Sequence, residues 1–327
     1  MDIVQKLGVV FFATAYLFGA RDFGPPVGSR LPAFTLADQS SRLHTAHGLM
    51  GPKGAVILFY RSADSAKPQL EELDQHQEAF RKLGLSVAAI SNDSVATLKS
   101  FAAHTGIQLP LLSDSASKVI RSLNVVDDTV SGTPARMGWL VVDASAAVSA
   151  KFFEADPSQA YTSAAILMHR FGWTPPEPPR KVEAKQITAT IDASNATVAP
   201  GERVELTVDI DLQHNLHVYA PGVETYIPIE WKIDDGAAAE VHDTVFPHAE
   251  KLYLKAINET VPTYTNHFRL RRDITIPAED KLKAAVDGSG HFVVNSTLKY
   301  QACDDRMCYF PQMVKLQWEF QYGAEKP

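Results

Sequence analysis

The residues best suited to chemistry are two cysteines near the C-terminus, Cys303 and Cys308, and they are the only cysteines among the 327 residues. Four residues separate them, so a hairpin can bring the two side chains within bonding distance. Closing a loop of about six residues stabilises a fold by only ~2 kcal/mol in the chain-entropy model. Such a bond adds little stability to the fold, and it is well suited to opening and closing reversibly. Reversible thiol-disulfide exchange, an inert structural disulfide and a soft-metal site using Met307, suited to Cu(I), all remain open.

No other group of residues predicts a catalytic or cofactor site. His214 and His217 are three residues apart, and in an extended segment their side chains point to opposite faces and do not converge. The sequence contains no Gly-rich phosphate loop, zinc motif or Ser/His/Asp elbow. We therefore expect no cofactor and no bound metal. The net charge of −7 leaves no global basic field, so no nucleic-acid partner is expected.

The first half of the chain, from residue 27 to 173, alternates strand and helix patterns. Ala55–Tyr60 is continuously apolar, which is typical of a strand buried on both faces. Further strands are predicted over 86–90 and 139–143. Helices are predicted over 68–83 and 158–171, and a third begins after a cap at Asp93 or Ser94. This alternation predicts an α/β domain with a central sheet.

The pattern changes at Thr174–Pro179, where four of six residues are proline. Such a segment favours an extended, semi-rigid spacer, and we place a linker over 174–183. Beyond it, apolar residues alternate strictly with polar ones over 204–212 and 314–320, and only 279–285 has a helical pattern. Short alternating strands with tight turns predict an all-β sandwich over 184–323.

Residues 7–20 form an apolar stretch of the length of a signal-peptide core, with Lys6 before it. We expect residues 1–22 to be a signal peptide or a membrane-anchoring leader, and the protein to be periplasmic or otherwise exported. A buried N-terminal helix or strand of a cytosolic protein is the alternative. Export would place Cys303 and Cys308 in an oxidising compartment, where a disulfide persists.

The first domain resembles the peroxiredoxin-like AhpC/TSA family of thioredoxin-fold proteins. The resemblance rests on Pro32–Asp38, on Val56–Ser62, and on Gly132-Thr-Pro134 followed by a strand. In that family the segment after Phe-Tyr-Arg-Ser carries the active-site cysteine. Here Ser65 and Ala66 stand in its place, and the loop is about three residues shorter.

The resemblance implies that Ser65, Ala66, Pro134 and Arg136 mark a degenerate former active site, with Pro134 in a position that permits a cis peptide bond. Peroxide reduction requires a thiolate that can be oxidised and then resolved by a second thiol. A serine hydroxyl has no such chemistry. We therefore expect a pseudo-enzyme that serves for docking, and no peroxidase activity.

The segment Tyr300–Pro311 resembles the active-site segment of the N-terminal periplasmic domain of DsbD, a thiol:disulfide interchange protein. The resemblance extends over about 185–322 and implies that Cys303 and Cys308 form a reversible disulfide, with Cys308 as the sulfur that a partner attacks. It implies a cap over the cysteines formed by Leu252 or Tyr253, although Tyr253 as a plain core residue is equally compatible. Tyr309 and Phe310 offer an apolar rim for a partner.

We therefore expect an α/β thioredoxin-like domain followed by an all-β immunoglobulin-like sandwich. The expected function is thiol-disulfide exchange with a thioredoxin-fold redox protein, in which a membrane reductant would be a separate polypeptide. The alternative is a non-catalytic binding or scaffold protein whose disulfide is structural.

Overall fold

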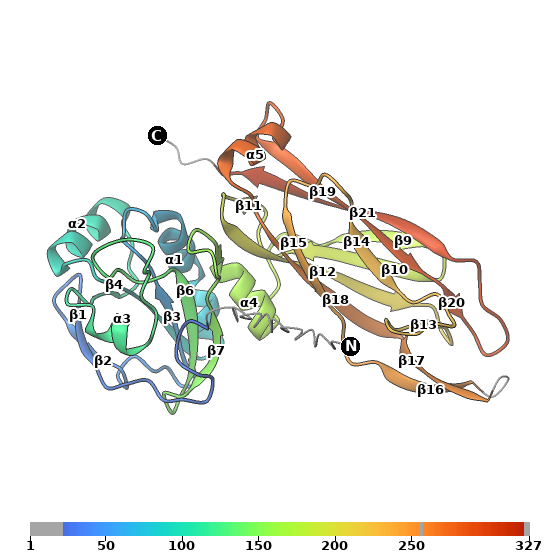
Figure 1. Ribbon diagram of the computed structural model, residues 1–327, viewed down its shortest axis with the longest axis horizontal. Coiled ribbons are helices and arrows are strands. Elements are labelled where there is room, and N and C mark those ends of the chain that lie inside the picture. Colours follow the sequence, from blue (N-terminus) through green and yellow to red (C-terminus); the bar gives the residue numbers. More distant parts are fainter. Residues whose placement is uncertain (1–21, 255–257, 324–327) are drawn as a thin grey trace, which may run out of the picture.

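The computed structural model describes residues 22–254 and 258–323, arranged as an α/β domain beside a β domain (Figure 1). The expected leader at residues 1–22 lies outside the described residues except for its last position. Among the residues that are described, no helix has both the length and the apolar character needed to cross a bilayer.

The first domain alternates strands and helices as the sequence predicts. Its elements are β1 (Thr35–Asp38), β2 (Leu43–Thr45), β3 (Gly54–Phe59), α1 (Lys67–Lys82), β4 (Leu85–Ser91), α2 (Val95–Thr105), β5 (Leu111–Ser113), α3 (Lys118–Ser122), β6 (Gly138–Asp143), β7 (Val148–Phe152), β8 (Ala160–Tyr161) and α4 (Ser163–Phe171). All six residues of β3 are buried, as expected of a strand covered on both faces. Ser94 caps α2, its hydroxyl accepting a hydrogen bond from Thr97 N.

Two strand groups, β2-β1-β5-β4 and β3-β6-β7, form the sheet framework of this domain. Strands β3 and β4 also lie side by side, with Tyr60 N donating to Ile90 O (3.2 Å). Apolar residues on one face of β3 pack with α1, α2 and α4, and those on the other face pack with α3. The sheet therefore has a hydrophobic core on each side.

The prediction of a helix over 158–171 is wrong about where the helix begins. Helix α4 begins at Ser163, because the Thr162 hydroxyl accepts from Ala165 N (3.0 Å) and caps the helix there. The two preceding residues form β8, which pairs in parallel with the first residues of β12 in the second domain.

The second domain is a β-sandwich with one short helix, as predicted. Its elements are β9 (Arg180–Ala184), β10 (Ile187–Ala193), β11 (Thr197–Val198), β12 (Glu202–Leu212), β13 (His217–Tyr219), β14 (Glu230–Ile233), β15 (Glu240–Val245), β16 (Glu250–Leu254), β17 (Glu259–Thr265), β18 (His267–Thr275), α5 (Glu279–Ala285), β19 (His291–Tyr300), β20 (Ala302–Cys303) and β21 (Gln312–Tyr322). No helix or strand covers 174–179, and β9 begins inside the segment predicted as a linker.

Three sheets build this domain, in the orders β15-β18-β12-β10-β9, β11-β21-β19-β14 and β16-β17-β13-β20. Inward-facing residues of the first two sheets share one core, in which the Trp231 and Trp318 rings lie 5.5 Å apart. The third sheet carries Cys303 at the end of β20, and that sheet positions the candidate site.

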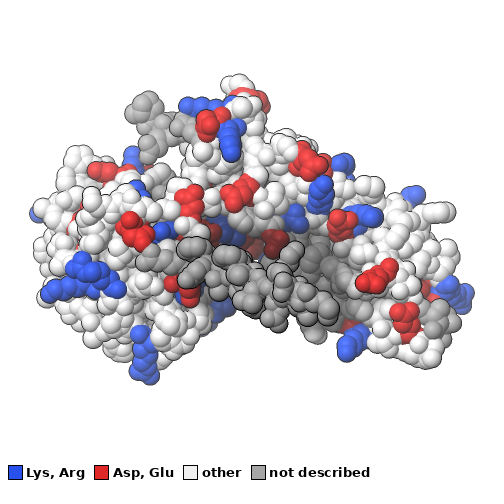
Figure 2. Space-filling model, in the orientation of Figure 1, with Lys and Arg blue, Asp and Glu red and all other residues white. Residues whose placement is uncertain are grey.

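The two domains meet along β8, α4 and the start of β12. Across this contact Tyr161 donates to Asp273 (2.6 Å), Arg203 pairs with Glu154 (2.6 Å), and Asn195 donates to Glu72 (2.9 Å). On the face shown in Figure 2, acidic and basic side chains are interspersed. Polar side chains that form specific pairs therefore contribute to the contact between the domains.

Candidate functional site

A short turn brings the two cysteines together. Asp304 Oδ1 accepts hydrogen bonds from Arg306 N (2.7 Å) and Met307 N (2.8 Å), and Asp304 N donates to Met307 O (2.9 Å). These backbone hydrogen bonds hold the pKa of the Asp304 carboxyl below its ordinary value. The turn places Cys308 opposite Cys303, and a disulfide joins them with their Cα atoms 4.0 Å apart.

The two cysteine residues differ in exposure. Cys303 is only 1% exposed, because β20 pairs with β13 and places Cys303 opposite His217. Cys308 follows the turn and is exposed. Exchange would require a thiolate to reach one sulfur while the other leaves, and the exposed residue of this pair is Cys308.

Aromatic and aliphatic side chains from β13 and from the β16–β17 hairpin cover the inner side of the disulfide. The Tyr219 hydroxyl lies 3.9 Å from Cys308 Sγ, and the Tyr219 ring stacks on Tyr226 at 4.2 Å. Val261 and Leu254 pack in the same cluster with Cys303. Sequence reasoning missed these residues as site residues. The signal was available for Tyr219, which lies two positions from His217 on the same face of a strand.

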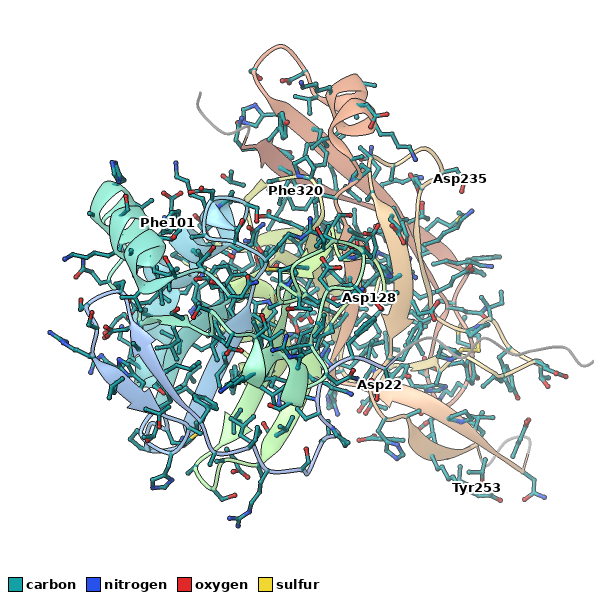
Figure 3. All side chains as sticks on the ribbon, turned by 60° about the vertical axis from the view of Figure 1, so that its left-hand side comes forward. Asp22, Phe101, Asp128, Asp235, Tyr253 and Phe320 are labelled. Atoms are coloured by element: carbon teal, nitrogen blue, oxygen red, sulfur yellow. A yellow bond between two sulfur atoms is a disulfide. The ribbon has the colours of Figure 1, made fainter. Side chains whose placement is uncertain are left out.

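The predicted cap residues Leu252 and Tyr253 lie on β16, and their neighbour Leu254 packs in the cluster with Cys303. Tyr253 is 53% exposed and lies near the outer end of the hairpin (Figure 3), where its hydroxyl donates to Asn258 (2.8 Å). Leu252 is half-buried and pairs with Val261 in register. The side of the strand that faces Cys303 is therefore the side of Leu254, and Leu252, two positions away, lies on that same side.

The two residues after Cys308 point in different directions. Tyr309 is half-buried against the sandwich core, and its hydroxyl donates to Asp304 (3.2 Å). Phe310 is 89% exposed, and Met307 and Met313 are also exposed. Tyr309 therefore supports the turn, whereas Phe310 provides apolar surface next to the exposed sulfur.

His217 lies directly beneath the site. Its ring contacts Tyr219 edge-on at 5.4 Å, and Nε2 is buried with no hydrogen-bond partner among the described residues. Burial lowers the pKa of His217, outweighing the opposite effect of Asp305 and Asp304. The imidazole is therefore neutral near pH 7. His214 is exposed in the preceding turn, so the two histidines do not converge.

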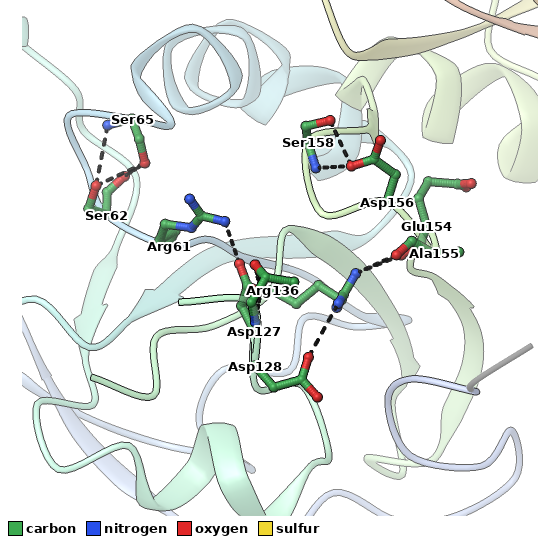
Figure 4. A network of polar contacts seen from close by, with 11 residues as sticks. Arg61, Ser62, Ser65, Asp127, Asp128, Arg136, Glu154, Ala155, Asp156 and Ser158 are labelled. Atoms are coloured by element: carbon green, nitrogen blue, oxygen red, sulfur yellow. Dashed lines mark hydrogen bonds and ion pairs between the residues drawn. The ribbon is translucent and has the colours of Figure 1, made fainter. Parts of the chain in front are cut away.

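The residues predicted as a degenerate former active site make separate polar contacts in the first domain. Ser65 is exposed and exchanges a hydrogen bond with the Ser62 hydroxyl (2.8 Å), and Ala66 is buried at the start of α1. In Figure 4 the Ser62–Ser65 pair is separate from Arg136, and the Arg61–Asp127 ion pair (2.5 Å) lies between them.

Arg136 is buried. Its guanidinium donates to the carbonyl oxygens of Glu154 (3.1 Å) and Ala155 (3.0 Å) and covers the Phe23 ring at 3.8 Å (Figure 4). Pro134 is buried, and no cis peptide bond occurs in the described ranges, so the cis bond that the Thr-Pro sequence permits is not formed.

Comparison with family models identifies both domains. Residues 27–150 match the AhpC/TSA family, and residues 184–317 match the N-terminal domain of the thiol:disulfide interchange protein DsbD. The chain therefore contains an AhpC/TSA thioredoxin-fold domain followed by a DsbD N-terminal domain. The second domain contains both cysteines, and the first contains none.

Individual relatives share only part of this chain. Alkyl hydroperoxide reductase E of Mycobacterium tuberculosis is 34% identical over 90 residues, which cover 27% of this chain and 59% of that protein. Chloroplastic peroxiredoxin Q of Sedum lineare is 32% identical over 116 residues, covering 35% of this chain and 62% of that protein. The chain thus spans about six tenths of the length of these relatives. The crystal structure of peroxidoxin BcpB from M. tuberculosis aligns with a TM-score of 0.37 and 22% identity, covering 40% of this chain and 86% of that one.

Proposed function

We propose that this protein is an exported thiol-disulfide exchange protein in which the Cys303–Cys308 bond opens and closes in each cycle. The observation that carries the proposal is the disulfide between an exposed cysteine, Cys308, and a buried one, Cys303. The match of residues 184–317 to the DsbD N-terminal domain supports the same chemistry. The partner that we propose is a redox protein with the thioredoxin fold.

The exchange proceeds in two steps that balance in electrons. A thiolate of the reduced partner attacks Cys308 Sγ, the Cys303–Cys308 bond breaks, and Cys303 leaves as a thiolate. The second thiol of the partner then attacks the mixed disulfide and releases Cys308. Two electrons pass from the partner to this protein, and the reverse sequence passes them on to an acceptor. A membrane reductant would be a separate polypeptide.

In this proposal the first domain docks a partner and does no redox chemistry of its own. It contains no cysteine, and Arg136, the residue expected near a peroxide site, donates to backbone carbonyl groups. The exposed Phe310 beside Cys308 provides an apolar contact for the partner at the exchange site.

Two single variants of the full chain test the proposal. Cys303→Ser leaves the exposed Cys308 thiol, which we expect to attack a thioredoxin-fold protein whose single remaining cysteine carries thionitrobenzoate, forming a mixed disulfide and releasing the thionitrobenzoate anion. Cys308→Ser leaves only the buried thiol and is the matched control, which we expect to trap little. Equal trapping by both variants, or by neither, would contradict the assigned roles.

The reduction potential of the wild-type pair separates exchange from a structural bond. A value of roughly −180 to −270 mV fits a working oxidoreductase, whereas a value below about −300 mV fits a structural disulfide and a scaffold protein. Thiol-dependent peroxide consumption by the double Cys→Ser variant would contradict an inactive first domain.

A further inference from the structure

One histidine and two carboxylates come together where the two domains meet, away from the residues assigned to exchange. His169 is on α4 of the first domain, and Glu205 and Asp273 are on β12 and β18 of the second. Glu205 and Asp273 are direct partners in the antiparallel register. One ligand atom from each of the three side chains lies within 4.8 Å of the others.

Glu205 has an unused ligand atom in this cluster. The residue is 1% exposed, and Oε2 lies 2.7 Å from His169 Nδ1. Oε1 of the same carboxylate is buried and has no hydrogen-bond partner among the described residues. A buried carboxylate oxygen without a partner is costly. Because Oε1 shares its carboxylate with Oε2, it lies next to the imidazole and within the cluster.

One carboxylate oxygen of Asp273, Oδ2, makes the contacts that fix the position of the side chain. Tyr161 OH (2.6 Å) and Arg203 Nε (3.2 Å) both contact Oδ2, so Oδ1 is the atom that can take a further ligand. These contacts come from both domains and fix the side chain in the manner of the hydrogen bonds that orient metal-binding carboxylates.

The local charge favours a cation. Three carboxylates gather here, those of Glu154, Glu205 and Asp273, against two guanidinium groups. Arg203 is shared between Glu154 and Asp273, and Arg271 donates to the carbonyl oxygen of His169 (3.0 Å). Glu205 pairs with His169, whereas the carboxylates of Glu154 and Asp273 share Arg203.

We propose that His169, Glu205 and Asp273 bind a divalent first-row transition metal of the Zn²⁺ type, which links the two domains. One imidazole nitrogen and two carboxylates suit Zn²⁺, whose bonds to such ligands are about 2.0 to 2.2 Å long. Bound ligand atoms then lie roughly 3 Å apart or more, so His169 and Glu205 separate slightly and the metal replaces the shared proton. His169 is half-buried, which leaves access for water as a further ligand.

The test uses the full chain with the disulfide oxidised, so that the cysteines cannot bind metal. Zn²⁺ is titrated by calorimetry, and Co²⁺ by visible absorption, which reports coordination directly. We expect one metal ion per chain and a rise in melting temperature on Zn²⁺ addition. His169→Gln and Glu205→Gln should each weaken binding at least tenfold; the second keeps the shape of the side chain and protects the test against misfolding.

His267→Gln is the matched control, because His267 on β18 also pairs with two carboxylates on β12, Asp211 (2.8 Å) and Asp209 (3.5 Å), but is exposed and uses a different nitrogen for each. We expect this variant to bind as the wild type does. Absence of stoichiometric binding by the wild type would overturn the proposal. So would equal affinity in the His169, Glu205 and His267 variants.

Discussion

Glu202, at the start of β12, makes the stability of this protein depend on pH. The side chain is 8% exposed and accepts a hydrogen bond from Ala199 N through Oε2 (2.8 Å). Burial, and after it the negative charge of Glu72 in the first domain, raise the pKa of Glu202 from 4.5 to about 8. The folded protein therefore binds a proton that the unfolded chain releases at a much lower pH.

The direction and size of the effect follow from these two pKa values. Because the folded state holds the proton more tightly, the free energy of unfolding falls as the pH rises from about 4.5 to about 8 and then levels off. Each pKa unit corresponds to about 1.36 kcal/mol, so the charged side chain destabilises the fold by about 5 kcal/mol above pH 8. At pH 5 the same group contributes less than about 1 kcal/mol.

Glu202→Gln removes the titration and keeps an acceptor for Ala199 N. We expect this variant to gain about 4 to 5 kcal/mol over the wild type at pH 8.5 and less than about 1 kcal/mol at pH 5. Urea unfolding followed by tryptophan fluorescence at both pH values measures the difference. Glu224→Gln, at an exposed position, is the control and should change neither value. An equal gain at the two pH values, or no gain at pH 8.5, would refute the reasoning.

Leu254→Ala uncovers the inner side of the disulfide, so we expect dithiothreitol to reduce it several-fold faster, whereas Tyr253→Ala on the opposite side of the strand should leave the rate unchanged. Equal rates in the two variants would show that Leu254 does not shield the bond. Gly54→Ala should lower the free energy of unfolding by about 3 kcal/mol or more, because φ is +123° and a Cβ would lie 1.9 Å from a carbonyl oxygen of β6. Gly132→Ala, also at positive φ but with no atom within 4 Å of the added Cβ, should cost only about 1 kcal/mol in chemical denaturation, and similar losses in both would contradict the steric argument.

The sequence predicts the elements whose pattern is local. Strand β3 is a continuous apolar run, β12 alternates with period two, and the boundaries of α5 coincide with the predicted 279–285. The start of α4 is not predicted, because Ala160 and Tyr161 pair with residues of β12 more than forty positions away. A long-range partner changes a segment that otherwise continues the helical pattern.

The cap over Cys303 shows that the sequence of a strand does not by itself predict which of its faces points inward. The sequence predicts a cap at Leu252 or Tyr253, and in the structure Leu254 packs in the cluster with Cys303, on the same face as Leu252 and one position beyond Tyr253. Adjacent residues on a strand face opposite sides, so a shift of one position exchanges the inner and outer sets. The pairing of Leu254 with Glu259 sets this phase, and the register of a hairpin depends on its partner strand as well as on its own residues.

The joint between the domains changes how the Pro-rich segment is interpreted. A spacer would keep the domains apart, but the contact is made before the prolines, at β8. Strand β10 ends at Ala193, opposite Leu206, and β8 continues that side of β12 by pairing with Glu202 and Arg203. Cutting the chain at 174 would remove this pairing.

The same cut would remove the polar partners that the first domain supplies. Asp273 would lose Tyr161, Glu205 would lose His169, and Arg203 would lose Glu154, although each of these groups is largely buried in the intact protein. The cut would expose these groups to water, so the loss is that of the charge-assisted hydrogen bonds across the contact, each worth about 1 to 3 kcal/mol. The first domain therefore helps to stabilise the sheet packed against the sandwich core of the second, a role that requires no cysteine and is independent of any partner it docks.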